Sequence, residues 1–208
     1  MFTLNCCSNL LTIDSPIVMG IINATPDSFY KGNIKDDILG LAAQMLSNGA
    51  TILDIGGQST KPNSLKIDTV EEYLYGYPGD EYIDILGLDN YGDLRQDATN
   101  MARFVNMLEI IVSLANEKYK PAALTETGSF TLFGNATMPE KNWFTKKLIK
   151  GIMRNELTRQ ISYIMVWRNA NSGHFHTPYP DHPAIPDFID FYNHPYTLFM
   201  SDMGKTQD

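Results

Sequence analysis

Five short, largely apolar runs of strand length alternate along this chain with segments whose apolar residues recur at helical spacing. The runs lie at residues 17–22, 51–55, 84–88, 122–124 and 161–167. Continuous apolar strands are typical of parallel sheets covered on both faces, and the helices between them provide the crossovers that parallel pairing requires. The sequence therefore predicts an α/β fold of about five parallel strand–helix units.

The segments between the runs predict the helices and one further feature. Helices are expected from Asp36 or Asp37 to the Asn48-Gly49 pair, and at 69–74, 100–117, 143–155 and 184–192. Residues 2–13 alternate weakly around Ser8-Asn9, which predicts an amino-terminal β-hairpin before the first unit. Five units are fewer than the eight of a closed (β/α) barrel, so a partial barrel of TIM type is expected.

Charge and composition restrict the class of partner. The 208 residues are enough for one sizeable core, and the net charge is −8 with no basic run, which argues against nucleic-acid binding. No apolar run is long enough to span a membrane, and the amino-terminal residues lack the pattern of a secretory signal. As written, the chain is expected to be soluble and cytoplasmic, and the adjacent Cys6 and Cys7 indicate no disulfide framework.

The stretch KPAALTETG, residues 120–128, places a carboxylate where ligands bind in α/β proteins. Glu126 follows the short buried run 122–124, and the carboxyl ends of parallel strands form the ligand-binding edge. A solvated strand cap is the alternative interpretation of Glu126 on this stretch alone. The remaining motifs of the chain help to choose between a ligand-binding carboxylate and a solvated strand cap at Glu126.

Residues 1–62 resemble the amino-terminal part of dihydropteroate synthase. The matching motifs are VMGIINATPDSF at 18–29, a helix ending SNGAT, and DIGGQSTKP at 54–62. In that family the asparagine of the first motif belongs to a magnesium–pyrophosphate site, and the loop of the second motif acts on the same substrate. The resemblance places these vestigial roles on Asn23, Ser59, Thr60 and Lys61.

This part also departs from the synthase pattern. Lys61 stands where the family usually has arginine, which removes bidentate contact with phosphate. The pterin-binding carboxylate, the lysine and the Ser-x-Arg-x-His end of the synthase have no counterpart here.

Residues from about 69 to the end resemble the carboxyl-terminal part of family 26 glycoside hydrolases, the β-mannanase group. The matching segments are EEYLYGYPGDEYIDILGLDNYGD, KPAALTETG and YIMVWRNANSGHFHTPYPDHPA. By this resemblance Glu126 stands at the position of the catalytic nucleophile, and Tyr91 and Asp89 stand where the family orients the nucleophile and contacts sugar. Trp167 stands at the stacking platform of the last strand. The resemblance implies a retaining endo-1,4-β-mannosidase that acts on β-mannan or mannooligosaccharides without a cofactor.

The general acid of that family has no counterpart. A retaining glycosidase needs a protonated carboxyl about 5–5.5 Å from the nucleophile. In family 26 it lies on the fourth barrel strand in a His-Glu motif, and this chain contains no His-Glu pair. Asp27 and Asp54 are the candidates for a substitute among the amino-terminal acids. Activity is therefore expected to be impaired.

The two resemblances together predict a chimera of barrel fragments. The synthase-like part, 1–62, supplies what resemble strands one and two, and the hydrolase-like part, 77–208, supplies strands six to eight, with a junction at 63–76. In a closed barrel strand eight neighbours strand one, so the five strands can pair side by side in a single α/β domain. Because both ends of the five strands are open edges, we expect the chain to close the gap either by forming a homodimer or by contracting into a smaller sheet.

Three functions follow, and they differ in class. The first is a weakened β-mannanase-like hydrolase, the second a catalytically inactive chimera of barrel fragments, and the third a protein that retains pterin-pyrophosphate binding.

His174 and His176 share the spacing of strand neighbours, but no carboxylate or cysteine completes a ligand set, so no metal site is expected.

Overall fold

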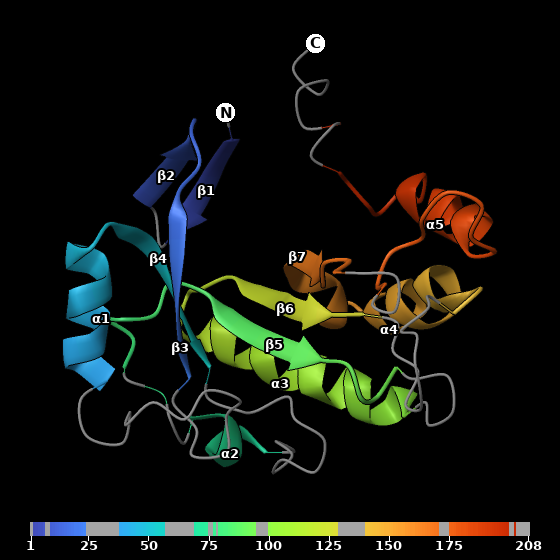
Figure 1. Ribbon diagram of the computed structural model, residues 1–208. Helices are drawn as coiled ribbons and strands as arrows, with labels where there is room; N and C mark the ends of the chain where they lie inside the picture. Colours follow the sequence, from blue (N-terminus) through green and yellow to red (C-terminus); the bar gives the residue numbers. More distant parts are fainter. Residues whose placement is uncertain are drawn as a thin grey trace. The chain divides into compact units, whose positions relative to one another are not determined.

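Strands and helices alternate along the chain as the sequence predicts (Figure 1). The computed structural model describes residues 2–6, 9–23, 38–56, 69–74, 77, 79–94, 100–128, 140–170, 175–199 and 202. The chain divides into two compact units. The first unit is Met1–Leu86 with Ser113–Pro121, and the second is Gly87–Val112 with Ala122–Asp208.

The first unit begins with the predicted hairpin and continues with one parallel strand pair. Strands β1 (Phe2–Cys6) and β2 (Asn9–Ile13) pair antiparallel, which confirms the hairpin. Strands β3 (Val18–Asn23) and β4 (Ala50–Gly56) pair in parallel, and α1 (Ile38–Ser47) connects them. The helix ends where expected, because Gly49 takes a positive φ of 101° that favours glycine. A short helix, α2 (Val70–Leu74), follows.

Apolar side chains of this unit remain open to solvent. No residue of α1 is buried, and Leu39 and Leu46 on it are exposed. Val18 and Ile21 on β3 are also more than half exposed, at 62% and 51%. These exposed groups are compatible with the predicted homodimer, which stays a prediction.

Asp54 on β4 lies opposite Ile21 on β3, and burial raises the pKa of its carboxyl. The folded unit therefore holds this proton to higher pH than the unfolded chain, where the reference pKa is 3.8. As the pH rises from 3.8 toward the raised pKa of the folded unit, the unfolded chain loses its proton first. Asp54 therefore lowers the free energy of unfolding at neutral pH.

We expect Asp54→Asn to raise the melting temperature at pH 7, because an amide of similar shape carries no charge into the partly buried site. The gain should shrink as pH falls toward 4 and vanish below the reference pKa of 3.8. Thermal melts across this pH range, with the exposed Asp84→Asn as control, measure the effect. A gain that is independent of pH would contradict the burial argument.

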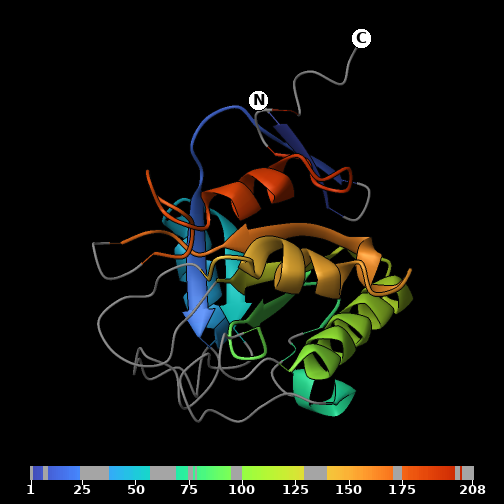
Figure 2. The same ribbon diagram turned by 90° about the vertical axis from the view of Figure 1, so that its right-hand side faces the viewer.

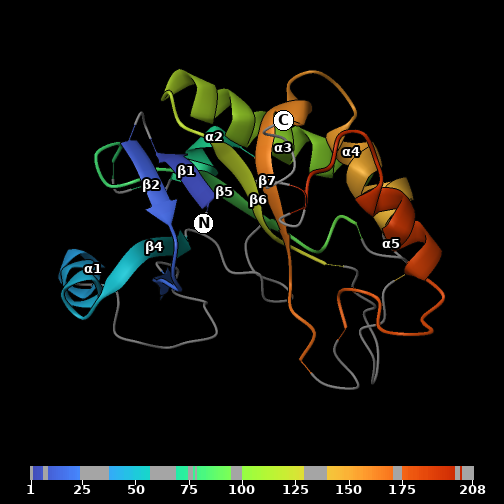
Figure 3. The same ribbon diagram turned by 90° about the horizontal axis from the view of Figure 1, so that it is seen from above.

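The second unit is built on a three-stranded sheet with β6 in the centre. The strands β5 (Leu86–Asn90), β6 (Ala122–Thr127) and β7 (Ile161–Val166) follow in the order β5-β6-β7, and β6 and β7 are parallel. Helix α3 (Met101–Glu117) connects β5 to β6 and runs along the sheet (Figures 1 and 3). Within this unit, the buried face of α3 carries Phe104, Met107, Leu108, Ile111 and Val112.

The strand pairing corrects one expectation and two boundaries. The described residues do not form a single sheet of five parallel strands, because β3–β4 and β5–β6–β7 are separate hydrogen-bonded sheets. Strand β5 lies two residues later than predicted, so that Asp89 and Asn90 belong to it. Strand β6 extends to Thr127, which places Glu126 inside the strand and not after it.

The carboxyl-terminal helices of the second unit are joined by a buried carboxylate. The helix predicted at 143–155 is a π-helix, η1 (Phe144–Ile149), continued by α4 (Lys150–Ile152), and a 3₁₀ turn, η2 (Thr158–Gln160), precedes β7. Helix α5 (Ile185–Tyr192) packs on η1 (Figure 2). Asp187 of α5 accepts hydrogen bonds from the Phe144 and Thr145 amides, at 2.8 and 3.2 Å, and from the Thr145 hydroxyl.

Candidate active site

A tyrosine and a glutamate meet at the ends of two neighbouring strands. Tyr91 is the residue after β5, and Glu126 is the penultimate residue of β6. The Tyr91 hydroxyl donates a hydrogen bond of 3.2 Å to Oε2 of Glu126, and both side chains are half-buried. The two residues that the resemblance assigns to nucleophile and orienting group are therefore in contact.

The electrostatics of the pair keep the tyrosine protonated. Burial raises the pKa of Tyr91 far above the ordinary tyrosine range, and the negative charge of Glu126 raises it further. The neutral phenol is thus the form present throughout the usual working range of a protein. It remains a hydrogen-bond donor to the carboxylate and fixes the position of Oε2 of Glu126.

The turn that carries Tyr91 is fixed by a buried polar cluster. The Asn90 side chain donates to Oδ2 of Asp93 at 2.8 Å, and the Asp93 amide donates to Oδ1 of Asn90. Arg103 of α3 forms an ion pair of 2.7 Å with the same Asp93 carboxylate. Sequence reasoning missed this cluster, although the Asn-x-x-Asp spacing is typical of a side-chain-locked turn.

Threonines on either side of Glu126 connect β6 to β5. The Thr125 hydroxyl donates to Oδ1 of Asp89 at 2.8 Å, and the buried Thr127 hydroxyl donates to the Asn90 carbonyl at 2.7 Å. The backbone at Glu126 is therefore held by side-chain hydrogen bonds of the residues before and after it. Asp89 is exposed and bonded to the residue before Glu126, and its predicted sugar contact stays a prediction.

Trp167 follows β7 on the other side of β6. Its backbone amide donates to the Thr127 carbonyl at 2.8 Å, and its side chain is half-buried. The sheet thus places Tyr91, Glu126 and Trp167 at the carboxyl ends of three adjacent strands. The stacking role of Trp167 stays a prediction.

The predicted pyrophosphate residues are not part of this site. Ser59, Thr60 and Lys61 lie outside the described residues, as does His174. Asn23 ends β3, where its backbone pairs with Gly56 at the end of β4. Within the described part of the chain no group of three histidine, cysteine or acidic side chains could hold a metal ion, and no helix there has the length and apolarity to cross a membrane.

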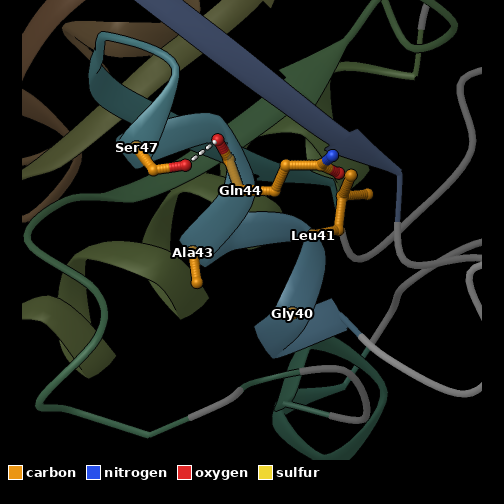
Figure 4. Close-up of a pocket in the computed structure, with 5 residues that line it drawn as sticks. All are labelled: Gly40, Leu41, Ala43, Gln44 and Ser47. Atoms are coloured by element: carbon orange, nitrogen blue, oxygen red, sulfur yellow. Dashed lines mark hydrogen bonds between the residues drawn. The ribbon is translucent and has the colours of Figure 1, made fainter.

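The surface of α1 carries a shallow hollow of about 680 Å³. Its lining comes from one helix, and the polar side chains there are those of Gln44 and Ser47 (Figure 4). The Ser47 hydroxyl is bonded to the Gln44 carbonyl at 2.8 Å. The hollow contains no ionisable group and offers no catalytic chemistry, so the candidate site remains the strand ends of the second unit.

Two families match different parts of the chain. The family described as glycosyl hydrolase family 26 matches residues 60–198. The family described as pterin binding enzyme matches residues 19–74. The two matches overlap at residues 60–74 and confirm the chimera-like composition. The junction at 63–76 stays a prediction.

Solved structures similar to this chain include two hydrolases of family 26. GH26C from Muricauda sp. has a TM-score of 0.59 and 33% identity, over 66% of this chain and 36% of that one. A GH26 β-mannanase from Bacteroides ovatus has a TM-score of 0.56 and 38% identity, over 66% of this chain and 37% of that one. A dihydropteroate synthase from Coxiella burnetii, with a TM-score of 0.50 and 20% identity over 85% of this chain and 69% of its own, shares the fold.

Curated relatives match about a third of the chain. The folic acid synthesis protein fol1 of Schizosaccharomyces pombe is 47% identical over 66 residues, 31% of this chain and 9% of the relative. Dihydropteroate synthase of Escherichia coli is 42% identical over 65 residues, 30% of this chain and 23% of the relative. The chain therefore spans under a quarter of these two relatives.

Proposed function

Because this chain belongs to glycosyl hydrolase family 26, we propose that it is a retaining glycoside hydrolase of the β-mannanase type, with Glu126 as its nucleophile. The observation that carries the proposal is the hydrogen bond from Tyr91 to Glu126 at the ends of adjacent strands. The similarity to a β-mannanase from Bacteroides ovatus supports β-mannan or mannooligosaccharide as the substrate class.

The first step is attack of the Glu126 carboxylate on the anomeric carbon. A bond forms between that carbon and a carboxylate oxygen, the glycosidic carbon–oxygen bond breaks, and its electron pair leaves with the aglycone. Tyr91 donates to Oε2 and thereby fixes the orientation of the Glu126 carboxylate for the attack. In the second step water attacks the mannosyl-enzyme and restores the carboxylate. We assign Trp167 as the platform for the apolar face of a pyranose and Asp89 as a sugar contact.

We also propose that the first step is impaired on natural substrates. The family match begins at residue 60, and the chain contains no His-Glu pair to supply the general acid. Without a proton the aglycone must leave as an anion, which is fast only for an acidic alcohol or phenol. The chain should therefore cleave activated aryl β-mannosides and leave β-mannan almost unchanged.

A fluorinated dinitrophenyl β-mannoside tests the proposal directly. Fluorine at C2 slows hydrolysis of the mannosyl-enzyme, while dinitrophenolate leaves without a proton, so the intermediate accumulates. We expect release of dinitrophenolate in proportion to protein, and a mass increase of one fluoromannosyl group on the peptide that contains Glu126. The matched methyl β-mannoside, whose leaving group needs a proton, should give no adduct. Release no faster than in buffer would support the inactive chimera, and an adduct on another residue would overturn the nucleophile assignment.

A further inference from the structure

His176 lies beside Tyr91, the hydrogen-bond partner of the candidate nucleophile, but has no part in the chemistry described above. Its side chain is only 2% exposed. The imidazole contacts the ring of Tyr91 edge-on, with centroids 5.8 Å apart and an interplanar angle of 64°. An edge-on ring pair of this kind adds to the energy of burial and fixes the relative orientation of both rings.

The end of β6 is shaped to receive this imidazole. Gly128 comes two residues after Glu126, and a β-carbon added there would lie 2.8 Å from Cγ and 3.0 Å from Cε1 of His176. No side chain at position 128 fits unless the buried ring moves. The absence of a side chain at Gly128 therefore allows His176 to lie against the nucleophile strand and Tyr91 at once.

The backbone that carries His176 is fixed by one asparagine. Oδ1 of Asn169 accepts hydrogen bonds from the His176 amide, at 2.8 Å, and from the Thr177 amide, at 3.1 Å. The Asn169 amide group in turn donates to the Thr177 carbonyl at 3.2 Å. Asn169 lies two residues after Trp167, so the clamp connects the end of β7 to the ring that contacts Tyr91.

We propose that His176 is a positioning residue that acts through Tyr91. Asn169 holds the backbone of His176, and the imidazole fills the space over Gly128 and supports the edge of the Tyr91 ring. The phenol hydroxyl then stays on Oε2 of Glu126. This inference deepens the proposed function and rests on it for its kinetic consequence, but the geometric part can be tested without catalysis.

The first test follows the ionisation of Tyr91 by ultraviolet difference absorbance. The titration of the wild type minus that of Tyr91→Phe isolates this tyrosine, and the same difference is taken in the His176→Ala background. The charged groups that act on Tyr91 are Glu126 and Asp89, and both remain in every variant. We expect the Tyr91 titration to move down toward the ordinary value of 10.0 when the imidazole is removed, because water then reaches the phenol. An unchanged titration would overturn the proposal whether or not the protein is active.

The second test is the first-order rate of labelling of Glu126 by the fluorinated mannoside. His176→Ala should lower this rate by about 10–100-fold, because the hydroxyl is no longer held on the carboxylate. Tyr91→Phe should lower it by a similar factor, and the double variant should lose no more than Tyr91→Phe alone. Additive losses would mean that His176 does not act through Tyr91. His176→Phe, which keeps an edge-on ring, should recover most of the rate.

Two further variants, one outside the site and one in the Asn169 clamp, separate positioning from loss of folding. His194→Ala removes an imidazole of the same unit whose Nδ1 accepts a bond from the Tyr196 amide, and it should label at the wild-type rate. Asn169→Ala should slow labelling in the same direction as His176→Ala while the protein stays folded. Absence of label in the wild type, together with a shifted Tyr91 titration in His176→Ala, would reject the proposed function and retain the positioning role.

Discussion

Glu126→Ala is expected to lower dinitrophenolate release from dinitrophenyl β-mannoside by about 10³-fold or more, because the carboxylate that forms the covalent intermediate is gone. Stopped-flow or steady-state absorbance of the phenolate measures the change. The matched control is Glu156→Ala, which removes an exposed glutamate of the same unit. Unchanged release in Glu126→Ala would show that the cleavage does not use this residue.

Azide adds a stereochemical readout to the comparison of the wild type with Glu126→Ala. In the wild type azide should displace Glu126 from the mannosyl-enzyme, and the second inversion gives β-mannosyl azide. In Glu126→Ala azide should occupy the space of the lost carboxylate and displace dinitrophenolate in one step, which gives α-mannosyl azide. Nuclear magnetic resonance of the anomeric proton distinguishes the two products. The same anomer from both proteins would contradict the nucleophile assignment.

Asp187→Ala is expected to lower the free energy of unfolding of the second unit by about 3 kcal/mol. Asp187 is buried, and its carboxylate accepts the amides of Phe144 and Thr145 at the start of η1. Its removal leaves the buried Phe144 amide and the partly buried Thr145 amide without this acceptor and opens a gap between α5 and η1. Urea unfolding followed by the fluorescence of Trp143, which is fully buried beside Phe144, reports the loss.

The control for this prediction lies on the same helix. Asp190 is exposed one turn beyond Asp187, and Asp190→Ala should change the unfolding free energy by less than about 0.5 kcal/mol. Asp187→Asn, which keeps one oxygen acceptor, should lose less than Asp187→Ala. Equal effects of Asp187→Ala and Asp190→Ala would show that the carboxylate does not hold the two helices together.

The alternation of strands and helices could be predicted from the sequence because apolar runs and helical spacing are local properties. The hairpin and the parallel pair β3–β4 followed from the same reasoning. The apolar run 84–88 predicts the wrong boundary for β5, because it ends before the polar Asp89 and Asn90, which the structure includes in the strand. Backbone pairing with β6 outweighed the low strand propensity of these residues.

The candidate site was predictable only through the resemblance to a family. A carboxylate at a strand end suggested a ligand site, but residue patterns alone did not connect Tyr91 to Glu126. His176 and Asp187 were missed as structural partners for the same reason, since each contacts residues far away in the sequence. Their roles arise from tertiary packing, which no local pattern contains.

The central place of β6 in its sheet fixes the strand that carries the proposed nucleophile, Glu126. Because β5 holds one edge of β6 and β7 holds the other, the strand keeps its alignment with help from its two immediate neighbours. In the proposed mechanism, holding the nucleophile and supplying the general acid are therefore separate tasks. A second protein that supplies one protonated carboxyl near Glu126 would then complete the catalytic pair without any change in the position of β6.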